Sequence, residues 1–148
     1  MLDQIKETVF KLYNAEEKKG VFLSGFDDNK RLVVSQGIVT TQQPLRETLS
    51  KLYISTIEPL LEQIAYISVD MVTDIVSFPQ ANEVLKLDPK EYGFVVEDLE
   101  DNKTGVILPN TAGVTDAKQV LYDLKKKYSI HGKVAVSGFK TERILISK

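Results

Sequence analysis

The sequence predicts an α+β fold, with a largely antiparallel mixed sheet flanked by helices. Three observations indicate this class. Several short β-branched segments alternate in the way that strands do, and other segments carry apolar residues three and four positions apart, as amphipathic helices do. The two kinds of segment are mixed without the strict alternation of a parallel βαβ array. The 148 residues match the commonest domain size, so we expect one domain over residues 1–148.

The first part of the chain predicts a helix followed by two strands. Apolar residues at helical spacing predict a helix over residues 2–19, with Gly20 just past its carboxyl end. A buried strand is expected over residues 21–23 and a returning strand over residues 32–34. The polar cluster at residues 27–29 supplies the turn between them.

The central part predicts a second helix and the longest strand. Pro44 opens the helix, and Pro59 ends or kinks it. The strand covers residues 63–76, and a short helix follows over residues 79–87. The buried side of this helix is expected to carry Leu45, Leu49, Leu52, Tyr53 and Thr56. In the strand, alternate side chains should point to opposite faces: one face carries Ile64, Tyr66 and Ser68, and the other carries Ala65, Ile67, Val69 and Met71.

The last part predicts a hairpin, a helix and a final strand. The hairpin strands cover residues 93–97 and 104–108, and Asp101-Asn102 forms the turn. Thr115 or Asp116 caps a helix that carries apolar residues at helical spacing. A last strand is expected over residues 134–136, with a second part over residues 139–146.

Composition excludes several classes of chemistry. The chain has no cysteine, which removes disulfides, thiolate metal sites and cysteine nucleophiles. A net charge of −2, with 19 basic and 21 acidic residues interleaved, gives no reason to expect nucleic acid as a partner. Acids precede any apolar run at the start, and no window approaches a membrane span. We therefore expect a cytoplasmic protein with no membrane partner.

Candidate catalytic and metal-ligating residues are few. His131 is the single histidine and lies in a polar turn, where exposure to solvent is the simpler interpretation. No Gly-x-Ser-x-Gly nucleophile elbow occurs, and no glycine-rich phosphate loop can be drawn. The acidic clusters at residues 27–29 and 97–102 lack calcium-loop spacing and coincide with expected turns. We expect neither a metal site nor a cofactor.

The segment from Ser35 to Gln43 is the remaining candidate site. Ser35, Gln36 and Gly37 end a predicted strand, and Thr40 follows before the helix that opens at Pro44. Small polar residues and a glycine between a strand and a helix N-terminus can form a binding concavity. The alternative is an ordinary polar connection. Lys127 ends a basic run that a solvated helix end explains, although an anion contact there stays open.

Four motifs in the second half of the chain form an ordered series. Gly93 to Glu97 and Gly105 to Pro109 are two glycine-led strands, a helix ends in Lys125 to Lys127, and an aromatic precedes Thr-Glu in residues 139–142. This series resembles the C-terminal half of the AMMECR-type domain, which is named for the Alport syndrome, mental retardation, midface hypoplasia and elliptocytosis chromosomal region. The N-terminal half is similar more weakly, so the resemblance spans nearly the whole chain and implies the fold of that family.

The chain departs from the family at its signature. The family's Leu-Arg-Gly-Cys-Ile-Gly falls on residues 32–37, where the leucine and the last glycine remain. Val33, Val34 and Ser35 replace the arginine, the first glycine and the cysteine, and the family's Asp-Pro-Arg-Phe stretch has no counterpart. Ser35 keeps a hydroxyl but lacks the nucleophilicity and metal affinity of a thiolate.

The resemblance implies an accessory or modification role, since microbial members of the family are often linked to a Memo-type protein and a radical-SAM enzyme. We expect a binding or accessory module. The expected partner is a protein or a small ligand, bound through Ser35, Gln36, Gly37 and Thr40, with Lys127 nearby. Two alternatives stay open. The chain is an enzyme of unknown reaction that uses the Ser35–Gln43 cleft, or it is a structural domain that pairs with itself as a homodimer. Whether any reaction is catalysed is left undecided.

Overall fold

The computed structural model confirms the α+β class. It describes residues 1–77, 83, 86–111, 113–114, 116–131 and 133–148. The strands form a six-stranded sheet in the order β2-β1-β3-β6-β4-β5, so that β2 and β5 are its edges. The strands are β1 (Val21–Phe26), β2 (Leu32–Ile38), β3 (Tyr66–Ser77), β4 (Gly93–Asp98), β5 (Thr104–Ile107) and β6 (Val134–Ser147). The α-helices are α1 (Leu2–Phe10), α2 (Leu45–Leu52) and α3 (Ala117–Lys127), and α2 continues as η1 (Tyr53–Ile57) and η2 (Glu58–Gln63).

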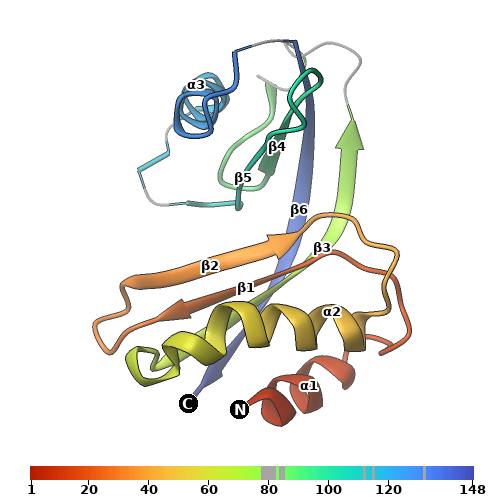
Figure 1. Ribbon diagram of the computed structural model, residues 1–148, viewed down its shortest axis with the longest axis vertical. Helices are drawn as coiled ribbons and strands as arrows, with labels where there is room; N and C mark the ends of the chain where they lie inside the picture. Colours follow the sequence, from red (N-terminus) through yellow and green to blue (C-terminus); the bar gives the residue numbers. More distant parts are fainter. Residues whose placement is uncertain (78–82, 84–85, 112, 115, 132) are drawn as a thin grey trace. The chain divides into compact units, whose positions relative to one another are not determined.

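The chain divides into two compact units. The first comprises Met1–Val72 and Glu142–Lys148, and the second comprises Thr73–Thr141. Both termini belong to the first unit, and β3 and β6 each contribute residues to both (Figure 1). Each unit has a hydrophobic cluster of its own, which we describe separately.

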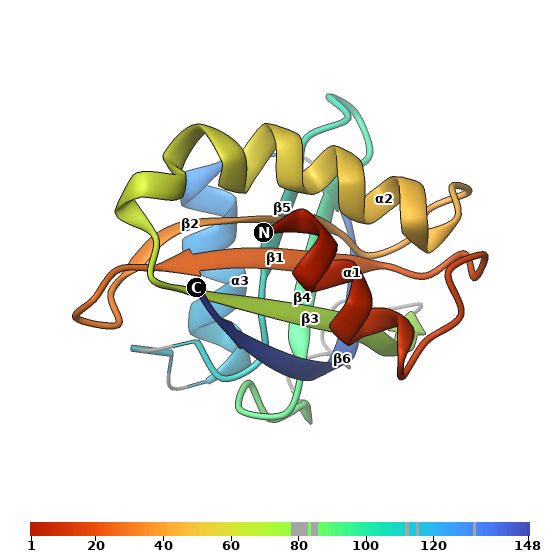
Figure 2. The same cartoon turned by 90° about the horizontal axis from the view of Figure 1, so that it is seen from below.

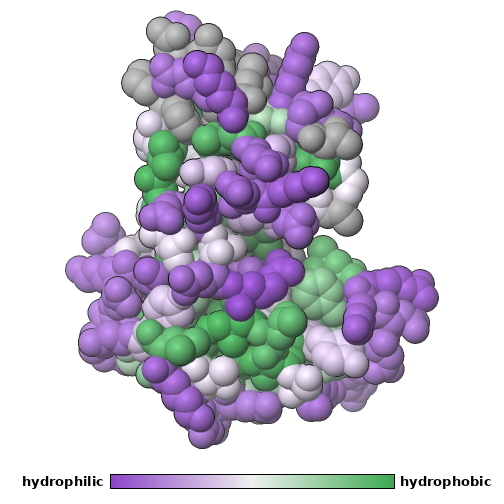
Figure 3. Space-filling view, turned by 180° about the vertical axis from the view of Figure 1, so that it is seen from behind, coloured by the Kyte–Doolittle hydropathy of each residue, from purple (hydrophilic) through white to green (hydrophobic). Residues whose placement is uncertain are grey.

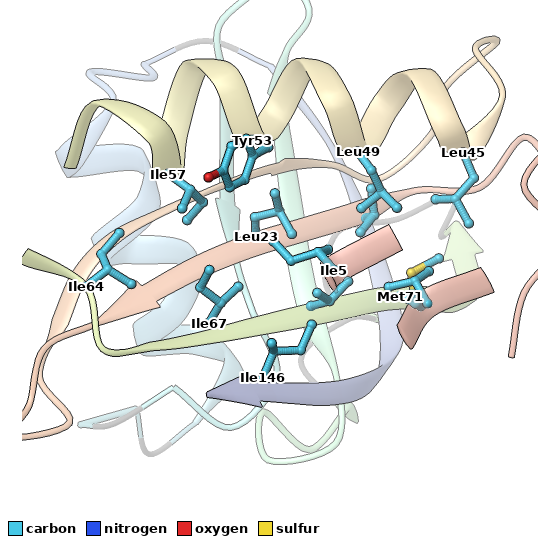
Figure 4. Close-up of a cluster of buried hydrophobic side chains, with 13 residues drawn as sticks. Ile5, Leu23, Leu45, Leu49, Tyr53, Ile57, Ile64, Ile67, Met71 and Ile146 are labelled. Carbon is cyan, nitrogen blue, oxygen red and sulfur yellow. The ribbon is translucent and has the colours of Figure 1, made fainter. Parts of the chain in front are cut away.

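The core of the first unit lies between the helices and one face of the sheet. Figure 2 shows α1 and α2 over β1 and β3, and Figure 4 shows the side chains that fill the space between them. Leu45, Leu49, Tyr53 and Thr56 are all buried, as the helical spacing predicts, whereas Leu52 is only half-buried. Leu60 has non-helical backbone angles after Pro59, which confirms the expected kink.

The first helix is shorter than the prediction of residues 2–19. It ends at Phe10, and Leu12, which lies within the predicted helix at apolar helical spacing, is 67% exposed. The residues after the helix contact α2 instead. The carbonyls of Ala15 and Glu17 accept hydrogen bonds from the backbone N–H groups of Arg46 and Leu45, respectively. They satisfy donors that a helix N-terminus otherwise leaves without partners.

Three other expectations in the first unit are corrected. Gly20 does not close a helix; it precedes β1 and packs so closely on Val39 that a Cβ would lie 2.0 Å from the Val39 carbonyl oxygen. Ile64 does not share the face of Tyr66, since it packs into the same cluster as Ile67. The returning strand does not stop at residue 34, because β2 continues to Ile38.

The second unit contains the predicted hairpin and its helix. β4 and β5 pair antiparallel, and Asn102 has a positive φ of 54° in the turn. Asp116 caps α3 by accepting a hydrogen bond from the Gln119 backbone N–H at 2.8 Å. The final strand is continuous as β6 rather than interrupted after residue 136. The alternative cap, Thr115, and most of the helix expected over residues 79–87 lie outside the described residues.

Polar and apolar side chains are mixed on the surface. In Figure 3, polar residues cover much of the displayed face, and apolar residues form smaller patches among them. Among the described apolar residues, Leu145 is 72% exposed, Leu12 is 67% exposed and Leu32 is 61% exposed. Within the part of the chain that the structure describes, no helix is long and apolar enough to cross a membrane.

Candidate functional site

The predicted binding residues lie in the edge strand β2 and just beyond it. Ser35, Gln36 and Gly37 are inside β2, not in a connection, and Thr40 is exposed in the bend that follows the strand. Register places Ser35 opposite Ser24 and Gln36 opposite Leu23. Because successive side chains of a strand point to opposite faces, the side chains of Ser35 and Gln36 lie on opposite faces of the sheet.

Gln36 faces the helices and has a structural partner. The Thr56 hydroxyl donates to Gln36 Oε1 at 2.9 Å, and Thr56 is 2% exposed. This bond joins β2 to η1. Gly37 is fixed by close packing, since a Cβ there would lie 2.4 Å from the Val21 carbonyl oxygen and 2.5 Å from Phe22 Cα. Both residues therefore help to define the backbone of β2.

Ser35 faces the other side of the sheet and begins a row of serines. Its Oγ lies 2.8 Å from Ser24 Oγ, and Ser24 in turn stands opposite Ser68 of β3 in the register. Ser35 is exposed, whereas Ser24 and Ser68 are 1% and 0% exposed. The row thus leads from a hydroxyl at the sheet edge to buried hydroxyls inside the sheet.

An ion pair follows the serine row on the same face. Asp70 stands opposite Phe22, whereas its neighbour Met71 stands opposite Val21 in the core cluster. The Ser68 hydroxyl donates to Asp70 Oδ2 at 3.4 Å. Arg143 of β6 donates from Nε to Asp70 Oδ1 at 2.8 Å and from Nη2 to Asp70 Oδ2 at 3.3 Å. We call the five residues Ser35, Ser24, Ser68, Asp70 and Arg143 the polar row.

Four members of the polar row were not among the predicted site residues. A signal for Asp70 exists, because an acid inside an otherwise apolar and β-branched strand must be paired if it is buried. Ser24, Ser68 and Arg143 carry no comparable signal. Their roles depend on which strands pair and in which register, and sequence spacing does not show this.

Lys127 is in the second unit, in the last turn of α3. Its ammonium nitrogen lies 5.4 Å from the centroid of the Tyr128 ring, a cation–π distance. Three lysines in that turn complement the negative end of the helix dipole. These contacts account for the basic run locally.

The acidic clusters act as turn formers. Asp27 Oδ1 accepts from the backbone N–H groups of Asn29 and Arg31, each at 2.9 Å. Asp98 Oδ1 accepts from those of Glu100 and Asp101, at 2.9 and 3.3 Å. These are the Asx-type bonds by which aspartate stabilises turns. Among the described residues, no group of three or more His, Cys, Asp or Glu side chains could hold a metal ion.

Comparison with known proteins shows the fold and no more. No protein-family model matches the sequence, and no curated protein matches it significantly. The crystal structure of an uncharacterized protein from Pyrococcus horikoshii aligns with a TM-score of 0.72. The alignment covers 90% of this chain and 80% of that chain, at 19% sequence identity. The two chains therefore share an architecture.

The Ser35 hydroxyl takes part in a hydrogen bond with the hydroxyl of Ser24. The hydrogen bond of its hydroxyl goes to another hydroxyl, whereas a serine nucleophile is activated by an adjacent base. A hydroxyl fixed by a buried neighbour can donate or accept in a defined direction.

Proposed function

We propose that the chain is an AMMECR-like binding or accessory module that uses the exposed end of the polar row, at Ser35, to contact its partner. The observation that carries the proposal is the hydrogen bond between the exposed Ser35 hydroxyl and the buried Ser24 hydroxyl. Gly37 and Gln36 support this surface, because their contacts with Phe22 and Thr56 fix the backbone of β2. Thr40 extends the surface beyond the strand.

The partner that we propose is a Memo-type protein or a radical-SAM enzyme of the same organism. Support comes from the resemblance of the hairpin, helix and final strand to the AMMECR-type domain. Ser35 stands where the family signature has its cysteine, so the chain has no thiol at this position, and the contact that we propose is made by a hydroxyl.

Isothermal titration of the purified chain with each of these two proteins tests the proposal. We expect binding to at least one of them, and we expect Ser35→Arg to abolish it by blocking the edge. Ser55→Arg is the matched control, since Ser55 is an exposed serine on η1. Binding that survives Ser35→Arg, or no binding to either protein, overturns the proposal.

The enzyme alternative is less well supported, because the Ser35 hydroxyl hydrogen-bonds to a hydroxyl instead of a base. A fluorophosphonate probe reacts covalently with activated serines. Labelling of the wild-type chain that disappears in Ser35→Ala would favour the enzyme. We expect no labelling at Ser35.

The homodimer alternative has one observation in its favour, which is that β2 is an edge strand with exposed Leu32 and Ile38. Edge strands present backbone groups that can pair with a second chain. Light scattering after size-exclusion chromatography distinguishes the homodimer from the monomer. A dimer that Ser35→Pro converts to a monomer would support pairing through β2, because proline removes a backbone donor.

A further inference from the structure

Arg143 has hydrogen-bonding capacity that its ion pair does not use. A guanidinium carries five N–H donors in one plane. Asp70 engages the side of the group, through Nε at 2.8 Å and Nη2 at 3.3 Å. The remaining donors belong to Nη1 and to the second hydrogen of Nη2, and they point away from Asp70. Those donors form the end of the guanidinium, whose planar fork matches the two oxygens of a carboxylate.

The two partners differ sharply in exposure. The Asp70 side chain is 2% exposed, whereas that of Arg143 is 46% exposed. A buried carboxylate stabilises a fold poorly, because removing it from water costs free energy that an apolar side chain would not. Its geometric effect is clear, however. It holds the exposed guanidinium by one side and fixes the direction of the other donors.

An exposed apolar side chain lies two positions from Arg143 on the same face of β6. Ile144 and Ile146 pack with the core cluster on the helix-covered face, so Arg143 and Leu145 project from the opposite face. Leu145 is 72% exposed, the largest exposed fraction among the large apolar residues that the structure describes. A charged fork and an uncovered leucine two positions apart can accept an acidic group and an apolar group together.

We infer that Arg143 binds the carboxylate of an organic acid or of a peptide C-terminus, with the apolar part of the ligand on Leu145. Asp70 is the positioning residue for the guanidinium. The inference goes beyond the proposed module role and stands whether or not Ser35 contacts a partner. The strands β2, β1, β3 and β6 are about 4.8 Å apart, so Ser35 is about 14 Å from β6, too far for one small acid to reach both.

Nuclear magnetic resonance titration tests this inference with defined probes. N-acetyl-leucine carries a carboxylate and an apolar group, N-acetyl-leucinamide lacks the carboxylate, and acetate lacks the apolar group. We expect N-acetyl-leucine to shift the Arg143 Nε–H signal and to bind more tightly than either control. Equal binding of the acid and the amide, or tighter binding of inorganic phosphate, overturns the inference. A short peptide ending in leucine that binds more tightly than N-acetyl-leucine identifies a peptide C-terminus as the source, and equal affinity identifies a free acid.

Variants of Arg143 and Asp70 distinguish the positioning of the guanidinium from the effect of its charge. Arg143→Lys keeps the charge and loses the fork, so the affinity should fall about tenfold or more. Asp70→Asn removes a negative charge beside Arg143, which by Coulomb attraction alone would strengthen binding. If Asp70 positions the guanidinium, Asp70→Asn weakens binding instead. Stronger or unchanged binding in Asp70→Asn removes the positioning role.

Leu145→Ser completes the test and does not touch the buried core. This variant should weaken the binding of N-acetyl-leucine and leave the affinity for acetate unchanged. If Asp70→Asn does not fold, Arg143→Lys and Leu145→Ser decide the outcome. Wild-type affinity for N-acetyl-leucine in both of these variants overturns the inference.

Discussion

Asp70 and Arg143 lie 73 residues apart in the chain and form a two-point ion pair, with Nε and Nη2 of Arg143 at 2.8 and 3.3 Å from the two carboxylate oxygens of Asp70. The pair joins a buried acid of β3 to a half-exposed base of β6. Loss of Arg143 would leave the Asp70 carboxylate buried without its charged partner, which is costly.

Arg143→Ala should therefore lower the free energy of unfolding by about 2–3 kcal/mol, the cost of leaving a charged hydrogen-bonding group unsatisfied. Urea denaturation measures this value. Arg46→Ala is the matched control, because Arg46 pairs with Glu16 at 2.7 Å while both side chains are exposed. Exposed pairs contribute little, so the control should barely change stability. Similar losses in the two variants would show that burial of Asp70 does not matter.

Gly37→Ala should destabilise the first unit by about 2 kcal/mol, as overpacking does. The added Cβ would meet backbone atoms of Val21 and Phe22 at 2.4 and 2.5 Å, and backbone cannot move aside easily. Gly138→Ala is the comparison, since its Cβ would meet the end of the Leu87 side chain at 2.6 Å, which can rotate away. Urea midpoints should fall more for Gly37→Ala than for Gly138→Ala, and the reverse order would contradict the proposed fixing of β2.

Tyr13 should lose its proton only at unusually high pH. Burial of the phenol, its hydrogen bond to Glu142 and the negative charges of Glu142 and Glu17 raise the pKa of Tyr13 to about 12. The unfolded chain releases this proton near pH 10. The folded state thus binds more protons between about pH 10 and 12, so this contribution to stability is complete below that range and is lost across it.

The absorbance of tyrosinate, compared between wild type and Tyr13→Phe, gives the titration of Tyr13. Glu142→Gln should move that titration to lower pH, because it removes the charge that disfavours tyrosinate. An unchanged midpoint in Glu142→Gln would mean that burial and the charge of Glu17, without Glu142, set the pKa of Tyr13.

Asp116→Ala should lower the free energy of unfolding by about 1 kcal/mol, because it removes the N-cap of α3. The carboxylate accepts from the Gln119 N–H at 2.8 Å, and Asp116 is exposed, so few other contacts are lost. Asp116→Ser should recover most of the loss, and Asp123→Ala, on the exposed side of the same helix, should have a small effect. Hydrogen exchange of the first-turn amides locates the change in α3; if these amides exchange at wild-type rates, the cap is not responsible.

Part of the fold follows from the sequence because its causes are local. The β4–β5 hairpin is predictable from two alternating segments and from Asn102, which tolerates the positive φ of the turn. α3 is predictable from its Asp116 cap and from the spacing of Val120 and Leu124. In each case the deciding contacts join residues a few positions apart.

Tertiary structure decided the end of the first helix, the length of β2 and the polar row. Helical spacing continues past Phe10, yet the carbonyls of Ala15 and Glu17 accept hydrogen bonds from the N-terminus of α2, and local sequence preference does not predict this contact. The sequence places Ser35 at the end of a strand, whereas in the structure it pairs with Ser24 in the middle of β2, because β1 lies beside β2 over its whole length.

The sequence by itself determined the α+β class, the hairpin and α3, and it indicated Ser35 as a candidate binding residue. Tertiary structure alone decided which side chains accompany Ser35 across the sheet and which base neutralises Asp70. The physical reason is that a strand's neighbours are chosen by pairing and register over the whole chain. An ion pair such as Asp70–Arg143 exists only once β3 and β6 have been brought together.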